Sequence, residues 1–192
     1  MCALWLSSPA QAADTVVDLS GAVPDDGLRH FFIELEVPTG IKEIEIAHDD
    51  LSADNILDWG LLDEKGAFRG WGGGNSENAV VGEAAASRSY LPGPIGAGKW
   101  KIVVGKAKIK QTPASYSVQV TMRDLATLPP QTTRTPYKAV APLLTETRWY
   151  AGDFHVHSIE SGDAKPPLDE IAAFAKGRKL DFVMLSDHNT VS

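Results

Sequence analysis

The sequence predicts a two-part α+β chain in which an antiparallel, jelly-roll-like β-sandwich precedes a single βαβ unit. Three observations lead to this fold class. Apolar and polar residues alternate with a period of two through much of residues 14–125, as expected of half-buried strands. Clusters of glycine, proline and aspartate interrupt the alternation at short intervals, which is typical of sandwiches. After residue 148 the pattern changes to strand, helix and strand.

Composition narrows the possible functions. The chain has 192 residues, of which 43% are hydrophobic and 22% charged, as in ordinary folded proteins. Its net charge of −7 argues against a nucleic acid polymer as partner, because phosphate binding relies on positive patches. No apolar run is long enough to predict a membrane-spanning helix. The single cysteine, Cys2, excludes an internal disulfide and a cysteine-based zinc site, so a metal site would need His, Asp and Glu.

Residues 1–12 are interpreted as the remnant of a signal peptide. A short apolar stretch at 2–6 precedes Ala10-Gln11-Ala12, which has the A-x-A pattern of a secretory cleavage site. A positive segment before the apolar stretch is missing, since the first basic residue is Arg29. The interpretation predicts a periplasmic or secreted protein, and the alternative is a disordered apolar tail.

Residues 13–125 are expected to form the β-sandwich domain. His30–Val37 alternates most clearly, with Phe31, Ile33 and Leu35 on one face of the expected strand. Similar alternation recurs at 43–46, 98–110 and 116–122, and turn signals occur at 38–40, 63–66, 70–75 and 91–98. A proline-rich linker follows at 126–148, where Pro129, Pro130, Pro136 and Pro142 predict an extended spacer.

Residues 149–192 are expected to fold as strand, helix and strand. The first strand is predicted over 149–157, and a helix is predicted to start near Pro166 and Pro167 and to end near Gly177. The run Phe182–Leu185 is continuously apolar, which indicates a strand buried on both faces of a parallel sheet.

The polar residues of this segment point to a metal site. Because side chains alternate along a strand, Asp153, His155 and His157 are expected on one face. The carboxyl ends of parallel strands meet, so His188 is expected beside His157, with Asp163 in the intervening loop. Imidazole is the commonest metal ligand in proteins, and three of the five histidines of the chain gather here. A structural histidine cluster without metal is the plainer alternative.

These runs resemble the start of a PHP (polymerase and histidinol phosphatase) domain, and more narrowly the CehA/McbA-like metallohydrolases, which carry a β-rich domain ahead of the barrel. The runs are 152–158 (GDFHVHS), 161–164 (SGDA) and 185–190 (LSDHNT). The resemblance implies a distorted (β/α) barrel with two or three zinc, manganese or iron ions. It implies that His155, His157, Asp163 and His188 are metal ligands. Asp187 is the catalytic candidate, orienting His188 or a metal-bound water.

The function expected from the resemblance is that of a metal-dependent hydrolase, a phosphoesterase that acts on a small phosphate ester or a related substrate. The family often reads Ser-Asp-Gly where this chain reads Ser161-Gly162-Asp163. It also supplies further Glu, His and Asp ligands from later strands, so residues 149–192 are expected to be an incomplete, N-terminal portion of the domain, inactive alone. The alternative function is an exported β-sandwich that binds glycan or protein and carries a non-catalytic tail.

Overall fold

The structure, a computed structural model, describes residues 14–73, 76–131 and 138–188. The predicted signal remnant at 1–12 lies outside these residues. The chain divides into two compact units, Met1–Pro130 and Gln131–Ser192, and each is described by itself. The first residues of the predicted linker at 126–148 therefore belong to the first unit.

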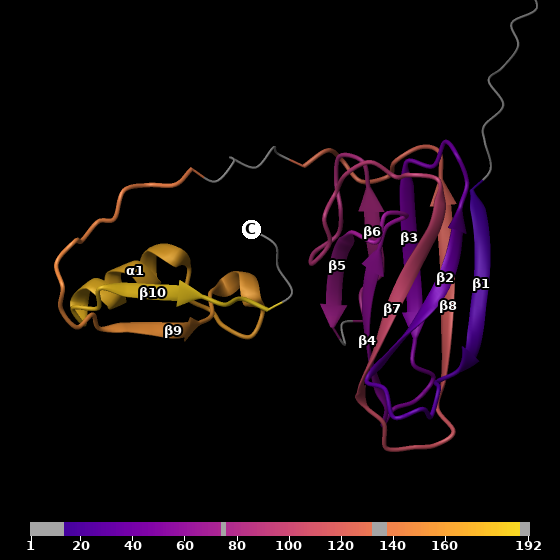
Figure 1. The fold of residues 1–192 in the computed structure, drawn as a ribbon, viewed down its shortest axis with the longest axis horizontal. Helices are drawn as coiled ribbons and strands as arrows, with labels where there is room; N and C mark the ends of the chain where they lie inside the picture. The colour runs from indigo at the N-terminus through magenta and orange to yellow at the C-terminus, as the bar shows by residue number, and fades with distance from the viewer. Residues whose placement is uncertain (1–13, 74–75, 132–137, 189–192) are drawn as a thin grey trace, which may run out of the picture. The chain divides into compact units, whose positions relative to one another are not determined.

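The first unit consists of two four-stranded antiparallel sheets (Figure 1). One sheet has the strand order β1-β8-β3-β6 and the other β2-β7-β4-β5, which is the strand order of an eight-stranded jelly roll. The antiparallel, β-rich architecture expected from the alternation is therefore confirmed. The strands are β1 (Thr15–Ala22), β2 (His30–Val37), β3 (Glu43–Asp49), β4 (Ile56–Leu62), β5 (Phe68–Gly73), β6 (Ala79–Gly82), β7 (Gly98–Lys108) and β8 (Ser115–Arg123).

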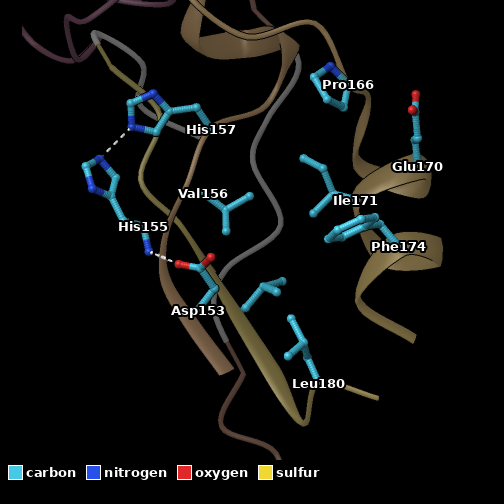
Figure 2. A pocket seen from close by; sticks show the side chains of 10 residues that line it. Asp153, His155, Val156, His157, Pro166, Glu170, Ile171, Phe174 and Leu180 are labelled. Carbon is cyan, nitrogen blue, oxygen red and sulfur yellow. Dashed lines mark hydrogen bonds between the residues drawn. The ribbon is translucent and has the colours of Figure 1, made fainter. Parts of the chain in front are cut away.

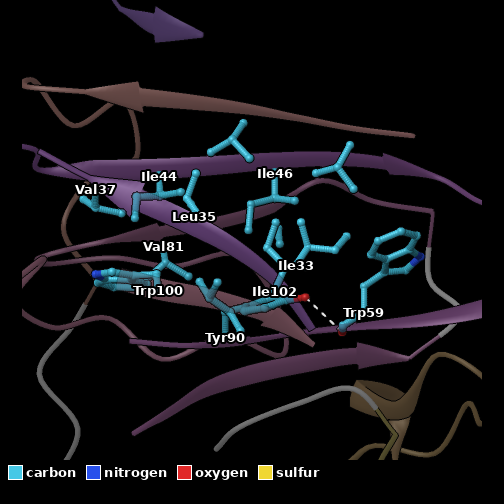
Figure 3. Packing of buried hydrophobic residues seen from close by; sticks show 14 of the residues in the cluster. Ile33, Leu35, Val37, Ile44, Ile46, Trp59, Val81, Tyr90, Trp100 and Ile102 are labelled. Atoms are coloured by element: carbon cyan, nitrogen blue, oxygen red, sulfur yellow. Dashed lines mark hydrogen bonds between the residues drawn. The ribbon is translucent and has the colours of Figure 1, made fainter. Parts of the chain in front are cut away.

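The core of this unit is built from the apolar positions of the alternating strands (Figure 3). Ile33 and Leu35 of β2 are buried together with Trp100 and Ile102 of β7, and the two strands pair in register. The polar residues between them face outward, where Lys99 contacts Glu34 at 3.2 Å. Period-two patterning thus determines both the strands and their buried faces.

The glycine-rich segment at 70–75, expected to be a turn, is largely strand. β5 extends to Gly73, and Gly70 forms an isolated bridge with Tyr90. A Cβ atom at Gly70 would lie 2.6 Å from the Cα atom of Tyr90. Glycine is needed here because another backbone approaches closely, which is a recognised use of glycine in strands.

Glu43 fixes the point where the chain leaves the sandwich. This carboxylate is fully buried and lies 3.1 Å from Nη1 of Arg123. It also accepts hydrogen bonds from the backbone N–H and the hydroxyl of Thr127 and from the N–H of Leu128. Burial raises the pKa of Glu43, but the hydrogen bonds from Thr127 and Leu128 and the charge of Arg123 outweigh it, so that the pKa is lowered.

The second unit contains the predicted strand, helix and strand, but the second strand is not buried on both faces as expected, because Met184 and Leu185 are about half exposed. The three elements are β9 (Gly152–Val156), α1 (Leu168–Gly177) and β10 (Phe182–Leu185), with a short 3-10 helix, η1 (Ile159–Ser161), after β9. β9 and β10 pair in parallel, so the segment is a βαβ unit. In the part of the chain that the structure describes, no helix is long and apolar enough to cross a membrane.

β9 is shorter than the strand predicted over 149–157, and the side chain of Asp181 contacts the residues that precede it. Asp181 accepts a hydrogen bond from the N–H of Ala151 and forms two short contacts with the guanidinium of Arg148, at 2.6 and 2.9 Å. Together with the hydrogen bond that the N–H of Asp181 donates to the carbonyl of Ala151 at 2.7 Å, these side-chain bonds join the two segments before Gly152. They also lower the pKa of Asp181 to about 2.

We expect the second unit to be much less protected from hydrogen exchange than the sandwich. Within residues 138–188 the buried side chains are those of Ser158, Ser161, Ile171 and Ala175, too few to offset the entropy of ordering the segment. Amides of Phe182–Leu185 should therefore exchange well before those of β7, as measured by mass spectrometry on the whole chain. Equal protection of the two strands would contradict this expectation.

Candidate metal centre

The parallel pairing of β9 and β10 brings two histidines together. His157 follows β9 and His188 lies three residues after β10, at the edge of the sheet where the carboxyl ends of both strands lie. The two imidazole rings are 4.5 Å apart between centroids and nearly perpendicular. The expected contact between His157 and His188 is therefore present.

Asp163 completes a group of three residues with the geometry of a metal site. The Oδ2 atom of Asp163 lies 3.0 Å from Nδ1 of His157 and 3.6 Å from Nε2 of His188. Ligand atoms of all three residues lie within 4.8 Å of one another. The Asp163 and His188 side chains are about half exposed, whereas that of His157 is 16% exposed. Two ring nitrogens and a carboxylate are a donor set suited to zinc and similar divalent ions.

His155 adjoins this group without being part of it. Its Nε2 atom lies 3.0 Å from Nε2 of His157 (Figure 2). His157 therefore contacts His155 through one ring nitrogen and Asp163 through the other. At 3.0 Å one of the two Nε2 atoms must carry the hydrogen that the other accepts.

The strict alternation expected of β9 is interrupted. Asp153 pairs with Val183 and Val156 with Leu185, so three steps along β9 match two along β10. An extra residue of this kind changes which face the following side chains occupy. The side chains of His155 and His157 nevertheless lie together, with their Nε2 atoms 3.0 Å apart, and Asp153 lines the same cavity as both.

The short helix η1 is capped by Ser158 and Gly162, and it brings the chain back toward His157. The side chain of Ser158 accepts a hydrogen bond from the N–H of Glu160, and Gly162 has a φ of 80° in the left-handed region, which glycine adopts without strain. This turn follows η1 and places Asp163 beside His157. The pKa of Asp163 is lowered by the hydrogen bond from Ser161, aided by the hydrogen bond and charge of His157.

Two serines of this turn were not singled out from the sequence. The buried hydroxyl of Ser161 accepts a hydrogen bond from the N–H of His188 at 2.9 Å and lies 3.4 Å from Nδ1 of His157. Ser158 is fully buried. The signal available in the sequence was Ser158 followed by Gly162, which is a helix-capping spacing.

Asp187 contacts the turn that follows β9. Its carboxylate accepts hydrogen bonds from the N–H of Ser158 at 2.5 Å and from the hydroxyl of Ser158 at 2.7 Å, and both bonds lower its pKa. These two bonds join the end of β10 to the turn after β9. The role expected of Asp187, orienting His188 or a metal-bound water, stays a prediction.

A cavity of about 420 Å³ lies between β9 and α1, beside the histidines (Figure 2). Its lining is mostly apolar, and its polar side chains are those of Asp153, Glu170 and the two histidines. The lining residues are Asp153, His155, Val156, His157, Pro166, Glu170, Ile171, Phe174, Leu180 and Val183. The cavity gives a small molecule access to the His155 side of the cluster.

Comparison with known proteins gives no family for the chain. No family model matches it, and no curated protein matches it.

Proposed function

We propose that residues 149–192 form the first βαβ unit of a PHP-type metal-dependent hydrolase that acts on phosphate esters. The observation that carries the proposal is the convergence of His157, Asp163 and His188 within 4.8 Å at the carboxyl ends of two parallel strands. The same three residues, with His155, occupy the positions of the metal ligands implied by the resemblance to PHP domains.

The residues present fit a divalent cation. His157 and His188 would offer ring nitrogens and Asp163 a carboxylate oxygen, a set that suits zinc, manganese or iron. When bound, such ions acidify water and neutralise charge on a phosphoryl group. Ser161 would hold the backbone of His188 in place, and Asp187 would hold the turn through Ser158. These contacts keep the ligands together before a metal binds.

Metal titration of the chain tests the proposal. We expect calorimetry to show binding of Zn²⁺ or Mn²⁺ that is weak enough to be reversed by dialysis against EDTA. Asp163→Asn should weaken binding by about tenfold, because the neutral amide removes the only negative charge of the trio. The matched control is Asp169→Asn in the first turn of α1, which should leave binding unchanged.

Two results would contradict the proposal: no binding to the unmodified chain, or equal affinities for Asp163→Asn and Asp169→Asn. Either would favour a histidine cluster held by hydrogen bonds alone.

A further inference from the structure

The indole of Trp71 lies across the outer face of the β2-β7-β4-β5 sheet. A Cβ atom at Gly60 of β4 would lie 2.4 Å from Cε3 of Trp71, and one at Gly105 of β7 would lie 3.0 Å from Cη2. Neither glycine has a positive φ, so backbone conformation does not require glycine at these positions. The two glycines instead leave room for the six-membered ring of Trp71, which rests on the backbone of both central strands.

Trp71 borders a hollow of about 600 Å³ on this face. Phe32 and Phe68 also line it and are 47% and 53% exposed. Large aromatic side chains exposed together are unusual on a sheet face that only meets water. The hollow therefore has the aromatic surface of a binding site, with the Trp71 ring held in place by the sheet beneath it.

The charged or titratable side chains that line the hollow are those of Arg29, His30, Asp58 and Lys106, and Nζ of Lys106 is already paired with Asp26 at 2.7 Å. Asp58 of β4 pairs with Gly105 of β7, and a Cβ atom added at Gly105 would lie 3.2 Å from the Cβ atom of Asp58. Asp58 therefore lies next to the Trp71 ring, while Arg29 lines the same hollow. Asp58 offers only acceptors and Arg29 only donors. The hollow thus suits an uncharged ligand that both donates and accepts hydrogen bonds.

From this arrangement we infer that the hollow binds a neutral oligosaccharide, with one pyranose ring stacked on Trp71. A pyranose presents C–H groups from one face, which match the negative face of an indole. Its hydroxyls both donate and accept, so they can bond Asp58 and Arg29 at once. The site lies on the sandwich and does not depend on the proposed metal centre.

Calorimetry on the whole chain in EDTA tests the inference. The probes are cellohexaose, xylohexaose, mannohexaose and laminarihexaose. We expect at least one to bind, and Trp71→Ala to weaken that binding about tenfold or more through loss of the stacked ring. Gly60→Ala should also weaken it while keeping the indole, because the added methyl displaces the ring. Circular dichroism and the urea midpoint establish that each variant is folded.

Trp149→Ala is the matched control, since this tryptophan is 97% exposed in the second unit and should leave binding unchanged. The inference is overturned if none of the four sugars binds, or if Trp71→Ala binds the sugar as tightly as the unmodified chain. It is also overturned if gel filtration shows a dimer that Trp71→Ala dissociates, because the face would then be an interface between two copies of the chain.

Discussion

His157→Ala is expected to lower the affinity of the chain for Zn²⁺ by about a hundredfold or more, and His155→Ala by about tenfold. His157 is the residue that contacts all the others: Asp163 at 3.0 Å, His155 at 3.0 Å and the His188 ring at 4.5 Å. Its removal leaves Asp163 and His188, both about half exposed, without the side chain that holds them together. In this cluster His155 contacts only Nε2 of His157, the ring nitrogen that does not contact Asp163.

Competition with a chromophoric chelator measures both affinities. His30→Ala is the matched control, because His30 is exposed and belongs to the first unit, and it should bind Zn²⁺ like the unmodified chain. The resemblance to PHP domains treats His155 and His157 alike as ligands, whereas the geometry ranks them. Equal losses, or a greater loss for His155→Ala, would contradict the ranking.

The alternating strands of the sandwich could be predicted from the sequence because their side chains have one buried face. Ile33 and Leu35 alternate with exposed glutamates, and a strand is the only regular structure that buries such a pattern. Gly70 misled the prediction, because its reason for being glycine is Tyr90, a residue distant in the sequence that approaches its backbone. Local patterns identify turns well but carry no information about such long-range neighbours.

The site was predictable to the extent that it follows from strand pairing. His157 and His188 meet because parallel strands end together. The roles of Ser158 and Asp187 could not be derived in this way, since they depend on a hydrogen bond between a turn and the end of another strand. The alternation of β9 also does not reveal that His155 lies outside the group of three and contacts His157 alone in the cluster.

Arg123→Met is expected to lower the free energy of unfolding of the sandwich by about 2–3 kcal/mol. The change leaves the fully buried carboxylate of Glu43 without its cation, whose Nη1 atom lies 3.1 Å away. The hydrogen bonds from Thr127 and Leu128 remain and keep the loss from being larger. Urea titration followed by tryptophan fluorescence measures the change.

The double variant Glu43→Gln/Arg123→Met should recover part of the loss, because the buried negative charge is then absent. Lys42→Met is the matched control: Lys42 pairs with Glu83 at 2.8 Å, but both side chains are exposed, so its loss should cost about 0.5 kcal/mol or less. A double variant no more stable than Arg123→Met alone would contradict the assignment of the penalty to Glu43.

The carboxylate of Glu43 also makes the stability of the sandwich depend on pH. Because the pKa of Glu43 is lowered in the folded chain, its contribution to stability is fully present above the pKa of an unfolded glutamate, about 4.3. The contribution is lost as the pH falls below that value and through the lowered pKa of the folded chain. Urea midpoints measured from pH 7 to pH 3 should therefore fall less steeply for Glu43→Gln than for the unmodified chain. Parallel slopes would show that another carboxyl group controls the acid stability of the sandwich.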